Sequence, residues 1–209
     1  MASSAPTPLA LPAPMREALA QAYATPPRAY HNQHHIDALL LDFDAVAATG
    51  GWAQPREVWL AILYHDAIYE AGRKDNEARS AQLAAREIAR WLPDAGIDVA
   101  RVVELIELTA CHGALVPDDF PADARGDDTR RFLDCDMAIL GAPPEAFDAY
   151  DRAIAAEYRQ VPRWLYALNR RKFLKALLAR ERIFLSDGFH ARLDAQARAN
   201  LRRAITTKR

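Results

Sequence analysis

Apolar residues recur along this chain at the spacing of amphipathic helices, and the strict alternation typical of strands is nearly absent. In residues 31–48 the apolar set includes Leu39, Phe43 and Val46, which share one helical face. Residues 55–69 are apolar on most sides, which is typical of a helix at the centre of a core. We therefore expect an all-α fold.

Capping and helix-breaking residues divide the rest of the chain. Pro14 lies in the first turn of one helix, Asp75 or Asn76 caps another, and Asp98 caps the next. The expected helices are 14–24, 31–48, 55–69, 76–91, 99–112, 128–140, 143–158, 163–185 and 191–206. Residues 113–128 are too rich in Pro, Gly and Asp to be regular. Residues 14–209 therefore read as one compact domain of about nine helices, after a flexible lead-in over residues 1–13.

Composition excludes several classes of protein. The formal net charge is −1, whereas a protein that binds duplex nucleic acid usually has a strongly basic domain. No apolar run approaches the length of a membrane span, and the N-terminus lacks the basic start of a signal peptide. Two cysteines cannot form a disulfide framework, which favours a reducing compartment. We expect a cytoplasmic protein that binds neither duplex nucleic acid nor membrane.

His65 and Asp66 lie near the end of the most apolar expected helix, where charged groups are costly without a partner. At a helix end both side chains can lean toward one ion in a crevice. The alternative is a core histidine that is hydrogen-bonded to a neighbouring acid.

Three histidines fall within five positions, at His31, His34 and His35. His31 and His35 are spaced i, i+4 and are expected on one helical face, so both can reach a single site. His34 is offset from that face and is expected to be incidental. A solvated surface cluster is the alternative for all three residues.

A third group of candidates lies in FLDCDMAIL, where Asp134 and Asp136 flank Cys135 in an otherwise apolar helix. Residues two apart do not share a helical face, so at most one carboxylate is expected to be a direct metal ligand. The other is expected to hold a ligating histidine in place. His112, at a helix end, is by itself more typical of a structural histidine. Cys111 and Cys135 are expected to be small buried apolar residues.

These segments resemble a known superfamily. AYHNQHHIDALL, LYHDAIYE, DNEARSAQLA, ELTACH and FLDCDMAILG, in this order, resemble a bacterial group of predicted HD-type phosphohydrolases, from about Tyr23 to Phe184. The signature of that superfamily is a helical His, a His-Asp doublet and a distant Asp. The resemblance implies an HD-type helical domain with a metal site between helices. It also implies four metal ligands, which are His35, His65, Asp66 and Asp136.

The resemblance suggests roles for further residues. YHNQHH is similar to the HNxxH element of cyclic-nucleotide phosphodiesterases, which implies that His35 binds metal and His31 protonates the leaving oxygen. His112 would line the pocket and contact phosphate or a second metal. Glu77, in DNEARSA, either caps its helix, which is slightly favoured, or orients the attacking water.

Cations near such a centre are candidate phosphate contacts. Arg28, Lys74 and Arg170 are the residues in question, since nearby positive charges favour a phosphorylated substrate. Each is equally compatible with a solvated surface charge. The segment WLYALNRRKFL matches a family segment that usually has Gly before the arginine, but here Asn169 precedes Arg170.

The leading hypothesis is a metal-dependent phosphohydrolase that cleaves a phosphate ester or anhydride of a nucleotide with a metal-activated water. Two histidines and two carboxylates suit Mn²⁺, Fe²⁺, Co²⁺, Ni²⁺ or, with waters, Mg²⁺. The expected partner is a small phosphorylated molecule, and a homo-oligomer is left open. The alternatives are a di-iron HD-type oxygenase, for which His112 could supply a ligand, and a non-catalytic nucleotide-binding HD module.

Overall fold

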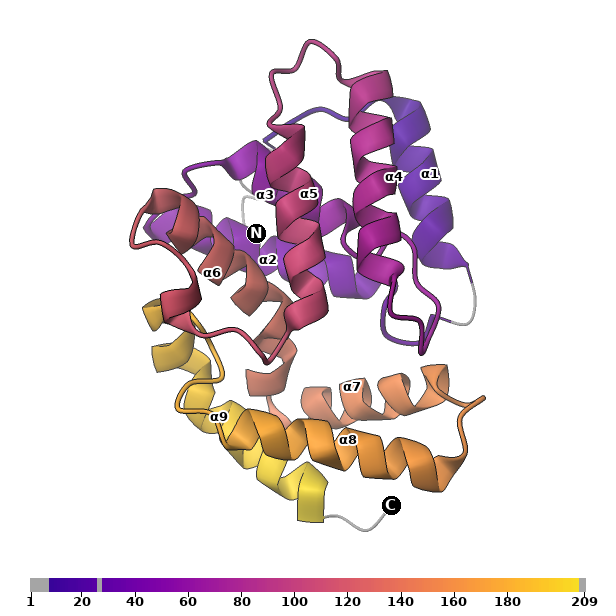
Figure 1. Ribbon diagram of the computed structural model, residues 1–209, viewed down its shortest axis with the longest axis vertical. Helices are drawn as coiled ribbons and strands as arrows, with labels where there is room; N and C mark the ends of the chain where they lie inside the picture. Colours follow the sequence, from indigo (N-terminus) through magenta and orange to yellow (C-terminus); the bar gives the residue numbers. More distant parts are fainter. Residues whose placement is uncertain (1–7, 26–27, 207–209) are drawn as a thin grey trace.

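A computed structural model describes residues 8–25 and 28–206, and within them all regular structure is helical (Figure 1). This confirms the all-α prediction and the expected number of helices. The α-helices are α1 (Ala13–Ala24), α2 (Gln33–Thr49), α3 (Pro55–Tyr64), α4 (Asn76–Trp91), α5 (Val99–Leu108), α6 (Ala124–Met137), α7 (Pro144–Glu157), α8 (Arg163–Leu178) and α9 (Asp187–Thr206). Three short 3₁₀ turns follow α5, precede α6 and follow α6, at Thr109–Cys111, Pro117–Asp119 and Ala138–Gly141.

Helix α3 forms the centre of the core. Its residues Val58, Leu60 and Ile62 are completely buried, and the helix contacts α2, α4, α5 and α6. Burying such side chains stabilises the fold by about 1.5–3 kcal/mol each, which explains why an apolar helix takes the central position. Leu11 also belongs to this core, so packing begins before residue 14. The first seven residues of the expected lead-in lie outside the described part of the chain.

Helix α3 ends earlier than expected, at Tyr64 rather than residue 69. The amide of Ala67 donates to the Tyr64 carbonyl at 3.0 Å, which turns the chain after the helix. The Ser80 hydroxyl then accepts from the Ile68 amide and donates to the Ile68 carbonyl. His65 and Asp66 therefore lie in a turn that α4 holds in place.

Helix α8 also ends early, at Leu178, and α9 begins at Asp187, before the expected residue 191. The intervening segment satisfies its amides with buried carboxylates. Ile183 donates to Asp194 at 2.8 Å, while Leu185 and Ser186 donate to Asp134 at 2.7 Å each. These tertiary partners replace the bonds that helix continuation would have provided.

Helix α6 begins four residues before the expected start, inside the loop predicted for 113–128. The Asp123 side chain caps it by accepting from the Gly126 amide at 2.7 Å. Gly126 packs so closely against the Pro121 carbonyl that a Cβ at this position would collide with it. In the sequence Gly126 favours a loop, but in the structure it lies in α6 and is required there for close packing against Pro121.

Helices α7, α8 and α9 gather at one end of the molecule, next to the C-terminal end of α6 (Figure 1). Helix α9 packs against α8 and against the 3₁₀ turn Ala138–Gly141. None of the helices in the described ranges is long and apolar enough to cross a membrane.

Candidate metal centre

The turn after α3 fixes the orientation of His65. Its Nδ1–H donates to the carbonyl of Ile62 at 2.9 Å, which satisfies a free carbonyl at the helix end. In the neutral ring this bond places the lone pair on Nε2. The side chain is almost completely buried. Nε2 of His65 is therefore the ring nitrogen that could ligate a metal.

His35 lies in the first turn of α2. The Asn32 side chain caps this helix by accepting from the His34 amide at 2.9 Å. His35 Nε2 lies 3.2 Å from His65 Nε2, so the two imidazole rings point their Nε2 atoms toward each other. His31 precedes the cap, so the expected i, i+4 helical relation to His35 is wrong. The two rings are nevertheless neighbours, with centroids 6.0 Å apart.

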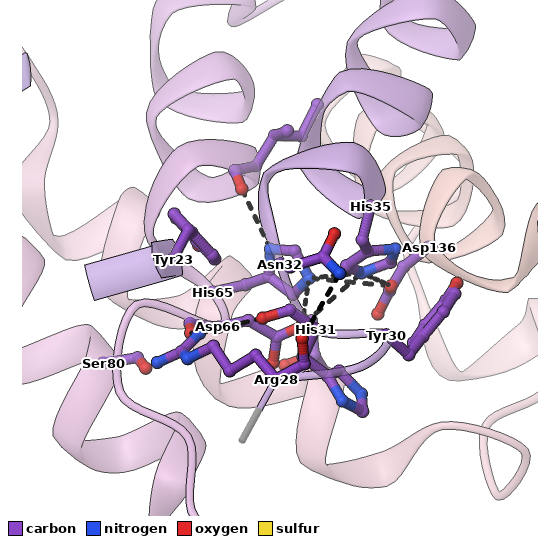
Figure 2. Close-up of polar contacts among 12 residues, drawn as sticks. Tyr23, Arg28, Tyr30, His31, Asn32, His35, His65, Asp66, Ser80 and Asp136 are labelled. Atoms are coloured by element: carbon purple, nitrogen blue, oxygen red, sulfur yellow. Dashed lines mark hydrogen bonds and ion pairs between the residues drawn. The ribbon is translucent and has the colours of Figure 1, made fainter. Parts of the chain in front are cut away.

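Asp66 and Asp136 complete a cluster around the two imidazoles (Figure 2). His35 Nε2 lies 3.4 Å from Asp66 Oδ2 and 3.0 Å from Asp136 Oδ1. His65 Nε2 lies 3.1 Å and 3.6 Å from the same two oxygens. One ligand atom each from His35, His65 and Asp66 lies within 4.8 Å of the other two. We call the four residues the His–Asp cluster.

The charges in the His–Asp cluster depend on one another. Burial alone would lower the pKa of His35 and His65, but Asp66 and Asp136 raise it above the ordinary value in both. Burial alone would raise the pKa of the two carboxyls, but the histidines hold it well below the usual range. The carboxylates are therefore ionised and ready to bind a positive charge.

The spacing of the cluster suits a common metal ion. Ligand atoms about 2.1 Å from one ion lie about 3.0 Å apart at octahedral corners and about 3.4 Å apart at tetrahedral corners. The imidazole–imidazole and imidazole–carboxylate distances fall between 3.0 and 3.6 Å. The spacing of the donors of His35, His65 and Asp66, which lie within 4.8 Å of one another, therefore fits a divalent cation, and Asp136 Oδ1 lies within 3.6 Å of both imidazoles.

A cavity of about 390 Å³ opens at the His–Asp cluster, and we call it the central cavity. Five aromatic rings line it, those of Tyr30, Tyr69, Tyr150, Tyr158 and Phe173. Four of the residues singled out from the sequence also line it, namely His31, Glu77, His112 and Arg170. His112 Nε2 lies 3.1 Å from Asp136 Oδ2, and burial lowers the pKa of His112. Glu77 makes no capping bond in the first turn of α4.

Glu157 is a site residue that the sequence analysis missed. Its Oε2 accepts from His31 Nδ1 at 2.6 Å, and its Oε1 accepts from the amides of Tyr30 and His31 at 2.7 and 3.1 Å. Burial alone would raise the pKa of Glu157, but these hydrogen bonds lower it. A signal was present in the sequence: Glu157 shares the buried face of α7 with Phe147, Asp151 and Ile154.

The three expected phosphate contacts differ in their placement. Arg170 lies on the central cavity, with Nε bonded to Asp151 at 3.0 Å and a buried Nη2 that has no hydrogen-bond partner among the described residues. Arg28 instead donates to the carbonyls of His31, Asp66 and Ala67 and does not line the cavity.

Lys74 is exposed and does not line the cavity either, whereas its neighbour Arg73 does. Arg73 is paired with Asp75 at 2.6 Å.

The neighbourhood of Asp136 corrects two expectations. Asp134 does not support a ligating histidine; it accepts from the Leu185 and Ser186 amides and from the Ser186 hydroxyl. Burial raises the pKa of Asp134 to about 7, although these bonds act in the opposite direction. Cys111 is exposed, contrary to expectation, while Cys135 is buried. His34 is exposed and is not part of the group of candidate ligands found in the described ranges.

No family model, curated protein or solved structure matches this chain. What the site does is therefore inferred from the chemistry of its residues, together with the motifs described above.

Proposed function

We propose that this protein is an HD-type, metal-dependent phosphohydrolase that cleaves a phosphate ester or anhydride of a nucleotide. The observation that carries the proposal is the convergence of Asp66 and Asp136 on the imidazoles of His35 and His65, with His–His and His–Asp separations of 3.0–3.6 Å. These residues would hold a divalent cation. When bound, such an ion would polarise a phosphoryl oxygen and lower the pKa of a water molecule.

His31 is the proposed proton donor to the leaving oxygen. Glu157 accepts the Nδ1–H of His31 at 2.6 Å, so Nε2 is the nitrogen left for the substrate. The ring of Tyr69 stacks on His31 with a centroid distance of 4.0 Å, which restricts its rotation. A positioned general acid of this kind typically contributes about 10²–10⁴-fold to the rate.

The walls of the central cavity support a phosphorylated, aromatic substrate. Arg170 Nη2 offers a donor without a partner in the described chain, and a guanidinium suits a phosphoryl group. The aromatic rings offer flat apolar surfaces on which a nucleobase can stack. Glu77 is placed at the cavity, where its carboxylate can orient a water molecule.

His112 favours a second candidate, the di-iron oxygenase. Its Nε2 lies 3.1 Å from Asp136 Oδ2, so His112 and Asp136 are the residues that would hold a second ion. The two candidates differ in metal content and in the reaction. Two irons per chain together with oxygen consumption would favour the oxygenase.

The test is metal analysis followed by an activity screen on the same sample. Purified protein loaded with Mn²⁺, Co²⁺ or Ni²⁺ is expected to release phosphate or nucleoside from a panel of nucleotides. Nucleotide binding without turnover under every metal would instead identify the non-catalytic binding module.

A further inference from the structure

A second and larger cavity lies beside the central one. It has a volume of about 1060 Å³ and is lined by α7, by α8, by the turn between them and by the end of α9. We call it the α7–α8 cavity, and its two helices are seen near one end of the molecule in Figure 1.

The α7–α8 cavity is strongly basic. Five arginines line it, from both helices and the turn: Arg152, Arg159, Arg163, Arg170 and Arg171. Its two acidic residues are already engaged, Asp148 with Arg203 at 2.9 Å and Asp151 with Arg170 at 3.0 Å. The protein as a whole has a formal net charge of −1, so this concentration of positive charge is local.

Four of these arginines are free to bind a ligand. Arg152, Arg159, Arg163 and Arg171 are exposed and make no hydrogen bond or ion pair with any residue in the described ranges. Unpaired guanidinium groups that surround one concave space favour a ligand with several negative oxygens, because each group can donate two parallel hydrogen bonds.

The α7–α8 cavity and the central cavity have lining residues in common. Tyr158 and Arg170 line both of them. Arg170 pairs with Asp151 through Nε, while its buried Nη2 has no hydrogen-bond partner in the part of the chain that is described. The two cavities therefore meet at Tyr158 and Arg170.

We propose that the α7–α8 cavity binds a second phosphate group of the substrate, so that the enzyme prefers nucleotides with two or more phosphate groups. This inference rests on the proposed function for the reaction, but the anion site itself can be measured without turnover. Inorganic tripolyphosphate is the binding probe, because it carries the phosphate chain and no base.

The test compares two double variants of the full-length protein. Arg152→Gln/Arg171→Gln removes one cation from each helical wall of the cavity, and both positions are exposed. Arg86→Gln/Arg90→Gln is the matched control, because both arginines are exposed on α4 and neither lines the cavity. Titration calorimetry at low salt is expected to show roughly tenfold weaker tripolyphosphate binding for the first variant and wild-type affinity for the control.

A second test compares the KM values of two substrates in the same variants. The ratio of the KM for a nucleoside triphosphate to the KM for p-nitrophenyl phosphate is expected to rise roughly tenfold in the cavity variant and to stay constant in the control. If the protein hydrolyses nothing, the proposed function fails while the calorimetry still tests the anion site. Equal tripolyphosphate affinity in wild type and both variants would overturn the inference, as would tighter binding of a single-stranded oligonucleotide than of tripolyphosphate.

Discussion

Two carboxylates that are two positions apart have different tasks. Asp136 contacts both imidazoles of the His–Asp cluster, whereas Asp134 binds the backbone of residues 185 and 186. Helical spacing indicated that at most one of them would be a direct ligand but left open which, and only the resemblance implied Asp136. The choice depends on the position of a segment about fifty residues away in the chain, which local pattern does not reveal.

This division of roles gives a first prediction. Asp136→Asn is expected to weaken metal binding by more than the ~10- to 100-fold that loss of an outer-shell partner costs. Asp134→Asn is expected to keep metal affinity and to destabilise the fold by about 1–3 kcal/mol, because its amide group faces three donors. Calorimetric metal titration and thermal unfolding separate the two effects. If Asp134→Asn instead lost metal affinity and Asp136→Asn lost only stability, Asp134 would be the metal ligand and Asp136 the structural residue.

In the proposed reaction Glu157 would act through His31, whose Nδ1–H it accepts at 2.6 Å, so its expected role is positioning. Glu157→Gln is expected to lower kcat about 10- to 100-fold with little change in KM, since this side chain does not line the central cavity. The pH profile of kcat is expected to change as well, because the amide replaces the charged carboxylate that accepts from His31 Nδ1. An unchanged pH profile with reduced activity would indicate a purely structural role.

The same carboxyl predicts a pH dependence of stability. The pKa of Glu157 is lower in the folded protein than its ordinary value of 4.5, so the folded state binds this proton more weakly than the unfolded chain. Its stabilising contribution is therefore present above about pH 4.5 and is lost as the pH falls through the folded value.

Unfolding of wild type and Glu157→Gln should reveal this contribution. At pH 7 the variant is expected to be less stable by about 1–3 kcal/mol. The difference should shrink as the pH falls below about 4.5. A difference that stays constant from pH 7 to pH 3 would rule out this linkage.

At the scale of elements, Arg28 connects the segment before α2 to the turn after α3. Its guanidinium donates to the carbonyls of His31, Asp66 and Ala67 at 3.0, 2.7 and 2.9 Å. It thereby joins the proposed proton donor to the turn that carries two proposed ligands. The expectation of a phosphate contact was plausible from the sequence because carbonyl partners cannot be seen there.

Arg28→Lys tests this structural role. An ammonium group cannot reproduce the two-nitrogen fork, so the variant is expected to lose about 1–3 kcal/mol of stability. Lys74→Ala is the control, since Lys74 is exposed and is expected to leave unfolding unchanged. A raised KM with wild-type unfolding in Arg28→Lys would instead support the phosphate contact.

Helix ends were harder to predict than helices. Caps with local partners, such as Asp98, which accepts from the Arg101 amide at 3.0 Å, were found from the sequence. The ends of α3 and α8 were misplaced because distant groups determine them, such as Ser80 for the turn after α3 and Asp134 for the segment after α8. Local pattern does not contain these tertiary partners.

At the scale of the whole molecule, helical periodicity was sufficient for the fold class. The spacing of histidines and acids gave several candidates, and the resemblance to the HD motifs narrowed them to the four residues of the His–Asp cluster. The distribution of charge over the molecule could not be predicted from the sequence. A net charge of −1 hides the basic cavity between α7 and α8, because its arginines come from two helices and the turn between them. Their common location is visible only in three dimensions.

The central claim is that the His–Asp cluster holds the divalent cation needed for phosphate hydrolysis. The most direct measurement is the rate of nucleotide hydrolysis as Mn²⁺ is titrated into metal-free protein, for wild type and for Asp66→Ala, with circular dichroism to confirm that the variant folds. The wild-type rate is expected to rise and saturate, while the folded variant stays at background at every concentration. Hydrolysis that survives in Asp66→Ala, or that is independent of metal in the wild type, would contradict the account.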